Sequence, residues 1–162
     1  MTETFTIRQA VRADAATIFQ FIQRIAAYEK MSGELEGDAA AVERTLFDEG
    51  QAECVLAEEN GEPVGFALYF FNYSTFKTKH GLYLEDLFVN PEKRGKGYGK
   101  ALLLYLAGLA HERGCGRMEW CCLNWNQPSI DFYKSLGATP MSEWTTYRLD
   151  EGQLARYAKQ QG

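Results

Sequence analysis

Residues 90–100 read NPEKRGKGYGK and join an apolar, strand-like segment to an apolar, helix-like one. Gly95, Gly97 and Gly99 alternate with larger residues, so the backbone can approach a bulky group closely. A helix that begins here directs unpaired N–H groups and a partial positive charge towards that group. The segment therefore predicts an anion cradle, and a diphosphate suits it, with the basic side chains of the segment adding positive charge.

The spacing of the glycines excludes two common phosphate-binding motifs. A Walker loop requires Gly-Lys followed by Ser or Thr after four spacer residues, and residues 90–100 contain no such run. A Rossmann fingerprint requires GxGxxG, but the sixth position counted from Gly95 is Lys100. A glycine-rich surface turn without a ligand remains as the alternative interpretation.

Apolar periodicity on both sides of this segment indicates alternating strands and helices. Strands are expected at 4–11, 53–58, 64–72, 82–90, 118–125 and 144–149, and helices at 14–30, 38–50, 98–113 and 128–137. Asn60-Gly61 indicates a tight hairpin, and residues 73–80 are interpreted as a polar, mobile loop. The order predicts an α/β fold in a single domain, residues 1–162, with a mixed, mostly antiparallel central sheet and helices on both faces.

The composition is that of an ordinary globular chain. Apolar residues make up 46% of the sequence and aromatic residues 14%, which suits a packed domain. No apolar run reaches the roughly 18 residues that a membrane span needs, and the first residues lack the pattern of a signal peptide, so a cytoplasmic location is expected. The net charge of -5, with dispersed basic residues, disfavours nucleic acid as a partner and suits a cationic small substrate.

The cysteines and histidines predict neither disulfides nor a metal site. The cysteines form no Cys-x-x-Cys pair, and the two adjacent ones should point to opposite faces of a strand. The histidines have no partner at metal-ligand spacing. We therefore expect reduced, structural thiols and no bound metal. The residues concerned are Cys54, Cys115, Cys121, Cys122, His80 and His111.

Two acidic residues interrupt the apolar strand LYLEDLFV at 82–89. An ionised carboxylate inside such a strand is unfavourable unless it is paired or solvated. Packing therefore does not explain Glu85 and Asp86, and one of them is expected to face a wet cleft. The alternative is an edge strand that carries surface acids.

A second motif lies downstream, in NQPSIDFYKSLGA at residues 126–138. Asn126, Ser129, Phe132 and Tyr133 have a spacing that is compatible with one helix. Taken by themselves, the two aromatic residues are also what a packed core would use.

The glycine-rich segment matches Arg-x-x-Gly-x-Gly through Arg94, Gly97 and Gly99, and so resembles the GNAT superfamily of acetyl-CoA-dependent N-acetyltransferases. Residues 126–138 are similar to the second coenzyme motif of that superfamily. The resemblance implies acetyl-CoA as co-substrate, with its pyrophosphate bound chiefly by backbone amides. The implied coenzyme-binding residues are Leu87, Phe88, Val89, Arg94, Gly95, Lys96, Gly97, Tyr98, Gly99, Lys100, Asn126, Ser129, Phe132 and Tyr133.

The resemblance narrows, through Tyr28-Glu29 and Glu85-Asp86, to the branch that acetylates diamines, polyamines and thialysine. It implies direct transfer to the primary amine of a small molecule, without a metal. Glu85 is the implied general base, acting through water, and Tyr133 is the implied acid for the departing thiolate. Tyr28, Glu29, Glu85 and Asp86 are the implied substrate-binding residues. A homodimer is expected because members of this branch usually form one.

Two stretches depart from that branch. The loop at 73–80 carries Lys77 and Lys79 where the spermidine enzymes use acidic and tryptophan residues, and residues 144–147 replace an acidic stretch. Both changes favour a short amine with its own carboxylate, such as a lysine analogue, which the basic loop could contact. Two alternatives remain open: an acetyl-CoA sensor or interaction module, and an acetyltransferase that acts on a protein or peptide amine.

Overall fold

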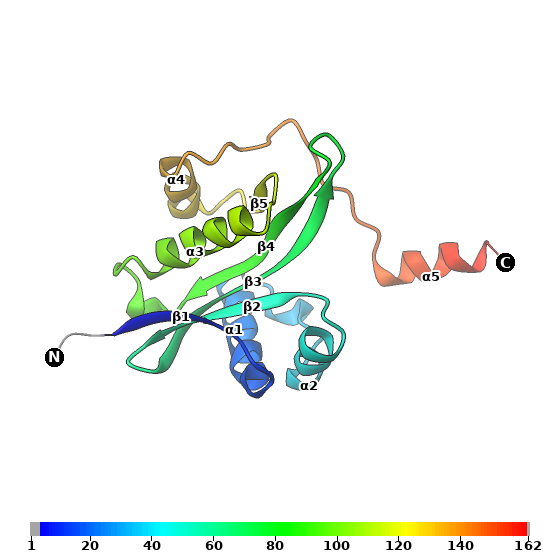
Figure 1. Ribbon diagram of the computed structural model, residues 1–162. Coiled ribbons are helices and arrows are strands. Elements are labelled where there is room, and N and C mark those ends of the chain that lie inside the picture. Colours follow the sequence, from blue (N-terminus) through cyan, green and yellow to red (C-terminus); the bar gives the residue numbers. More distant parts are fainter. Residues whose placement is uncertain (1–3, 162) are drawn as a thin grey trace. The chain divides into compact units, whose positions relative to one another are not determined.

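The central sheet of the computed structural model has the strand order β1-β2-β3-β4-β5 within the described residues, 4–161 (Figure 1). Neighbouring strands from β1 to β4 are antiparallel, and β5 runs parallel to β4. The expected mixed, mostly antiparallel sheet is confirmed. The strands are β1 (Phe5–Gln9), β2 (Glu53–Glu59), β3 (Glu62–Ser74), β4 (Lys79–Val89) and β5 (Met118–Trp120). The chain divides into a first unit that ends at Cys121 and a second unit that begins at Cys122.

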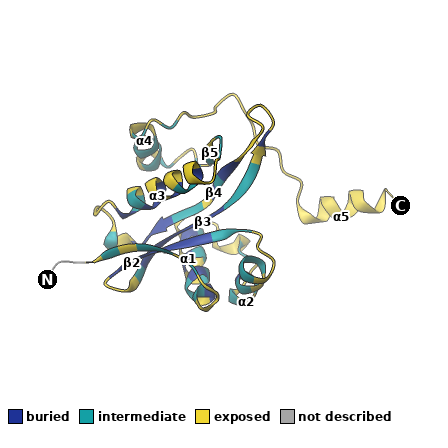
Figure 2. Cartoon of the chain, in the orientation of Figure 1, coloured by how far each residue is buried: buried dark blue, intermediate teal, exposed yellow. Residues whose placement is uncertain are grey.

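Helices cover both faces of the sheet in the first unit (Figure 1). Side chains of β4 alternate between the faces, so Phe88 packs in the core on the side of α1 (Ala15–Tyr28). A Cβ on Gly99 of α3 (Tyr98–Glu112) would contact Leu87 and Val89 on the other side. The core on the α1 side contains Ile18, Phe21, Ile25, Cys54, Leu56, Phe66 and Phe88. Figure 2 shows buried residues along the central strands and on part of α1.

The remaining helical elements are short. A helix begins after Asp38, whose carboxylate accepts the N–H of Ala41 at 2.8 Å, as expected of an N-cap. These elements are α2 (Ala39–Glu43), a π-helical turn (Arg44–Asp48), α4 (Gln127–Ser135), α5 (Glu151–Lys159) and the 3₁₀ turns Arg12–Asp14, Ser32–Glu34 and Pro91–Lys93. No helix within residues 4–161 has both the length and the apolar character needed to cross a membrane.

The sequence predicted the hairpin between β2 and β3 correctly, but it did not predict the full length of the hairpin between β3 and β4. Asn60 and Gly61 both have positive φ angles, 54° and 82°, and form the expected tight turn between β2 and β3. The expected loop at 73–80 is too long: only residues 75–78 form the turn, because β3 continues to Ser74 and pairs there with Lys79 of β4. Ladder hydrogen bonds stabilise this polar end of the hairpin, and polar composition alone does not reveal them.

Two expected strands are also wrong in part or in whole. The strand at 118–125 stops at Trp120, and within the described residues 144–149 form no strand. A helix that was not expected, α5, follows instead. Asp150 accepts the N–H of Gln153 at 3.0 Å, and the side chain of Gln153 accepts the N–H of Asp150 at 2.9 Å. This capping box, Asp-x-x-Gln, was visible in the sequence and stabilises the first turn of α5.

Candidate active site

Glu85 occupies a bulge in β4. Leu68 pairs with Asp86 and Tyr69 pairs with Leu84, so Glu85 is an extra residue on its strand. A bulge bends the strand and redirects a side chain. Glu85 is exposed, whereas Leu84 before it is buried and Asp86 after it is half-buried. The bulge explains how two adjacent carboxylates fit into an otherwise apolar strand.

Only a short middle part of β4 pairs with β5. Leu82, Tyr83 and Leu84 are matched with Met118–Trp120, and the parallel pairing ends there. Beyond Leu84, the described sheet pairs β4 only with β3, on one edge. The backbone of residues 87–89 therefore presents its other edge to groups outside the sheet, as a strand does when it binds an extended ligand.

Gly95 and Gly97 shape the connection between β4 and α3. Their φ angles are +84° and +83°, a conformation that residues with a side chain rarely adopt. Among the described residues, no atom lies within 4 Å of where a Cβ would stand on either glycine. α3 begins directly afterwards, at Tyr98, so the partial positive charge of its N-terminal end is directed towards these glycines. The connection is therefore an open turn in front of a helix, and its use as a diphosphate cradle stays a prediction.

The guanidinium of Arg94 turns back towards the sheet. Its Nε donates a hydrogen bond to the carbonyl oxygen of Val89 at 3.1 Å. Its central carbon lies 5.1 Å from the ring centre of Tyr28 and 5.2 Å from that of Phe88. Cation–π contacts of this length help to hold the guanidinium in place. Arg94 thus connects the cradle with the end of α1, next to Glu29.

Three carboxylates form one electrostatic cluster beside the bulge. Burial, and then the charges of Glu85 and Glu29, raise the pKa of Asp86 from 3.8 to about 6. Burial and the charge of Glu85 also raise the pKa of Glu29. Such charge effects require the groups to lie close together. The fold therefore brings together the acidic residues that the sequence analysis assigned to the substrate.

Glu59, at the end of β2, was not identified from the sequence. Its side chain is only 5% exposed and accepts hydrogen bonds from Lys93 Nζ at 2.6 Å, Lys96 Nζ at 3.1 Å and the hydroxyl of Tyr98. The bonds from Lys93, Tyr98 and Lys96 lower the pKa of Glu59 to about 2. The ammonium group of Lys96, expected to bind coenzyme, is thus engaged by Glu59. The sequence contained one indication of an inward carboxylate, the pair Glu58-Glu59 before a tight turn. Adjacent residues of a strand point to opposite faces of the sheet, so one of the two is directed inwards.

In the second unit, the downstream motif forms α4 and its cap. The side-chain oxygen of Asn126 accepts the N–H of Ser129 at 3.4 Å, so the Asn-x-x-Ser spacing serves as an N-cap. The rings of Phe132 and Tyr133 lie 5.6 Å apart on the same helix. All four residues of the motif therefore belong to one local element.

The bulged β4, the cradle and α4 all lie within residues 18–138, which match the model of the acetyltransferase (GNAT) family. The chain belongs to the GNAT family of acetyltransferases. Its fold is the GNAT fold, and the predicted resemblance to this family is confirmed.

This GNAT chain is similar to named amine acetyltransferases. It is 36% identical over 162 residues to thialysine N-epsilon-acetyltransferase of Bos taurus, which covers 93% of this chain and 94% of the relative. It is 35% identical over 161 residues to spermidine/spermine N(1)-acetyltransferase-like protein 1 of Homo sapiens, covering 93% of this chain and 23% of that protein. An integron cassette protein from the mobile metagenome of V. cholerae has a TM-score of 0.80 at 27% identity, covering 96% and 98% of the two chains. The chain is an N-acetyltransferase of the GNAT family.

The basic end of the β3–β4 hairpin lies away from the carboxylate cluster of this GNAT domain. Lys79 begins β4 six residues before Glu85, which is about 20 Å along a strand at about 3.3 Å per residue. The side chain of Lys77 covers Gly116, where an added Cβ would stand 2.7 Å from Lys77 Cδ. The sequence analysis suggested that these lysines contact the carboxylate of a short substrate held at Glu85. One chain alone does not bring the lysines to such a substrate.

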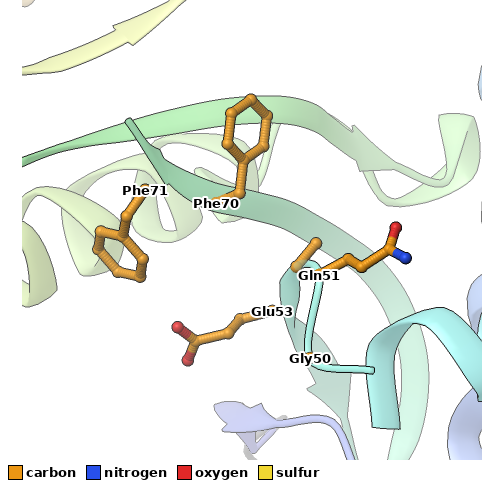
Figure 3. A pocket seen from close by; sticks show the side chains of 6 residues that line it. Gly50, Gln51, Glu53, Phe70 and Phe71 are labelled. Atoms are coloured by element: carbon orange, nitrogen blue, oxygen red, sulfur yellow. The ribbon is translucent and has the colours of Figure 1, made fainter. Parts of the chain in front are cut away.

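A cavity of about 220 Å³ lies at the start of β2, at the opposite end of that strand from Glu59 (Figure 3). It is lined by Gly50, Gln51, Ala52, Glu53, Phe70 and Phe71. Arg113 binds both oxygens of Glu53, at 2.6 and 3.0 Å, and lies 5.0 Å from the ring centre of Phe71. None of the lining residues was assigned to coenzyme or amine, and the one carboxylate among them is already paired.

The four cysteines of this GNAT chain carry free thiols. Burial raises the pKa of Cys54 to about 12, which makes it an unreactive core residue. Among residues 4–161, His, Cys, Asp and Glu side chains form no group of three that could hold a metal ion.

The raised pKa of Asp86 leads to a testable effect on stability. Because the folded state binds the proton more tightly than the unfolded state, ionisation of Asp86 destabilises the fold as pH rises from about 4 through about 6. Asp86→Asn should therefore increase the free energy of unfolding near pH 8, by on the order of 2–3 kcal/mol, and by much less near pH 4. Urea unfolding at both pH values measures this difference. An equal change at the two pH values would contradict the buried, ionising carboxylate.

Proposed function

We propose that this GNAT enzyme transfers the acetyl group of acetyl-CoA directly to the primary amine of a small cationic molecule, such as a diamine, a polyamine or a lysine analogue like thialysine. The carboxylate cluster of Glu29, Glu85 and Asp86 carries this proposal. The charge of Glu85 raises the pKa of both Asp86 and Glu29, so the three acids form a site whose repulsion a bound ammonium group relieves. The names of the relatives support the same class of substrate.

The coenzyme would be held by the backbone of the first unit. The open cradle at Gly95 and Gly97, with the first N–H groups of α3, suits the diphosphate. The outer edge of residues 87–89 suits the pantetheine arm, and an N–H group there suits the acetyl carbonyl oxygen. When bound, acetyl-CoA supplies the reactive thioester. Metal and a covalent enzyme intermediate are not part of this proposal.

The amine must lose a proton before it attacks. An amine of the lysine type has a pKa of about 10.4 and is an ammonium ion near neutral pH. Glu85 is the exposed member of the cluster, at the bulge, and so suits a base that accepts the proton through water. Asp86 and Glu29 hold the ammonium by charge and hydrogen bonds, with Tyr28 beside them at the end of α1.

The departing sulfur needs a proton at the end of the reaction. A thiol of this kind has a pKa of about 8.5, on the cysteine scale. By its match to the family motif on α4, we assign this proton transfer to the phenol of Tyr133. By the same resemblance we expect the enzyme to act as a homodimer.

A thiol-release assay tests the acceptor directly. Acetyl-CoA is supplied with thialysine, lysine, spermidine, putrescine, an aminoglycoside or a short peptide, and the products are identified by mass. We expect the free small amines to react at least about 10-fold faster than the peptide, because placing the ammonium end of a peptide at the acidic cluster also removes water from its backbone amides. Reaction with the peptide alone would replace this proposal by a protein acetyltransferase. Binding of acetyl-CoA without reaction on any acceptor would favour a sensor.

A further inference from the structure

The carboxylate of Glu59 lies where an ionised group is unfavourable unless it is well paired. It is the last residue of β2, and its side chain is 5% exposed. Loss of water around a carboxylate must be offset by hydrogen bonds and opposite charge. Two ammonium groups and one hydroxyl provide that compensation, so the cluster is a complete set of contacts rather than a surface ion pair.

All three donors belong to the segment that contains the cradle. Lys93 precedes Gly95, Lys96 lies between the two positive-φ glycines, and Tyr98 follows Gly97. One carboxylate therefore binds the beginning, the middle and the end of the same short loop.

The loop is also fixed to the edge of the sheet. The ring of Tyr98 stacks on the ring of Phe5, with centres 4.1 Å apart and planes 7° from parallel. Phe5 of β1 pairs directly with Glu59 of β2. Tyr98 therefore contacts neighbouring positions on two strands, through its hydroxyl and through its ring.

The glycines themselves contribute little to the order of this loop. They have no side chains, and the space beside them is open among the described residues. A loop of this kind loses much conformational freedom when a ligand orders it, unless other contacts have ordered it beforehand. The bonds to Glu59 are such contacts, and they leave the backbone of Gly95 and Gly97 accessible.

We propose that Glu59 is a positioning residue that holds the glycine cradle, through Lys93, Lys96 and Tyr98, in the shape that receives the diphosphate of the coenzyme. This inference rests on the proposed use of acetyl-CoA. In this role Glu59 acts through the loop and not on the coenzyme. It also holds the ammonium groups of both lysines and offsets one of their two positive charges, so the cradle offers N–H groups rather than mobile ammonium groups.

Calorimetric binding of CoA, compared between Glu59→Gln and the wild-type protein, tests this role. The matched control is Glu58→Gln, because Glu58 precedes Glu59 on the same strand and forms its own ion pair with Arg8 at 3.1 Å. We expect the Kd for CoA to rise about 10-fold in Glu59→Gln, because the amide cannot form the ion pairs with Lys93 and Lys96, and by less than about twofold in Glu58→Gln. The KM for acetyl-CoA should rise with this Kd, with kcat and the KM for the amine unchanged.

Amide hydrogen exchange of residues 93–98, without ligand, separates this role from the proposed function. Exchange should be faster in Glu59→Gln than in the wild-type protein or in Glu58→Gln, because the loop has lost the carboxylate that accepts hydrogen bonds from Lys93, Lys96 and Tyr98. Wild-type protein that fails to bind CoA would overturn the proposed function, and the positioning role towards coenzyme with it. Wild-type protein that binds CoA, with unchanged affinity and exchange in a folded Glu59→Gln, would overturn the positioning role alone.

A second variant applies if Glu59→Gln does not fold. Tyr98→Phe keeps the ring on Phe5 and removes only the hydroxyl that donates to Glu59. Its Kd for CoA should rise about threefold, as expected for one hydrogen bond of three. A Kd equal to that of the wild-type protein would contradict the proposal.

Discussion

Replacing Glu85 by Gln should lower kcat/KM for the amine about 100-fold near pH 7, and much less near pH 9.5. The amide keeps the size of the side chain at the bulge but cannot accept a proton. Near neutral pH almost all of the amine is protonated, so the reaction depends on a base. As the pH approaches the pKa of the amine, about 10.4, the free amine is already present and the base matters less.

The measurement is a pH–rate profile of both proteins with saturating acetyl-CoA. Glu119→Gln is the matched control, because Glu119 lies on the neighbouring strand β5 and pairs with Arg117 at 3.3 Å. Its profile should coincide with that of the wild-type protein. A loss in Glu85→Gln that is equal at every pH would mean that Glu85 positions the ammonium and does not remove its proton.

Replacing Tyr133 by Phe should lower kcat by about 100-fold or more, because positioned proton transfer contributes about that much to a reaction rate. The ring remains, including its contact with Phe132 on α4, so the Kd for CoA should stay within about threefold of the wild-type value. The two quantities together distinguish a chemical role from a role in holding the coenzyme.

Single-turnover rates and calorimetry give the two quantities. Tyr157→Phe is a suitable control, because Tyr157 lies on α5 of the same unit and carries a similar phenol. Its rate should not change. Wild-type kcat in Tyr133→Phe would remove this phenol from the mechanism, and a large loss of CoA affinity with normal kcat would make it a coenzyme-binding residue only.

Much of the site could be recognised from residue types because those residues satisfy local requirements. Gly95 and Gly97 have positive φ angles, which glycine adopts readily, and the expected helix α3 begins directly behind them. Asn126 caps α4, as a residue of its type before a proline-initiated helix should. Asn60-Gly61 forms the expected turn. Each of these features depends on the backbone within a few residues, and a sequence records such preferences directly.

Errors in the sequence analysis occurred where a segment depends on a distant partner. Residues 144–149 alternate like a strand, but a strand exists only where another strand pairs with it, and the described residues provide none there. Residues 73–80 are polar like a loop, yet the pairing of β3 with β4 extends through Ser74 and Lys79. Local composition is a poor guide to pairing, because the hydrogen bonds join segments through backbone atoms that every residue shares.

The sequence alone therefore predicted the cradle and the acids of the candidate site, because glycines, caps and apolar periodicity express short-range constraints, and its motifs carried the resemblance to the GNAT family that the family match confirms. Only the three-dimensional contacts place Glu85 in a bulge, bring Glu29 from the end of α1 to Asp86, and direct the carboxylate of Glu59 onto the loop at Lys93. These depend on strand register and on the packing of α1 against the sheet. Both are set by free-energy differences summed over many distant contacts, which no local pattern of residues contains.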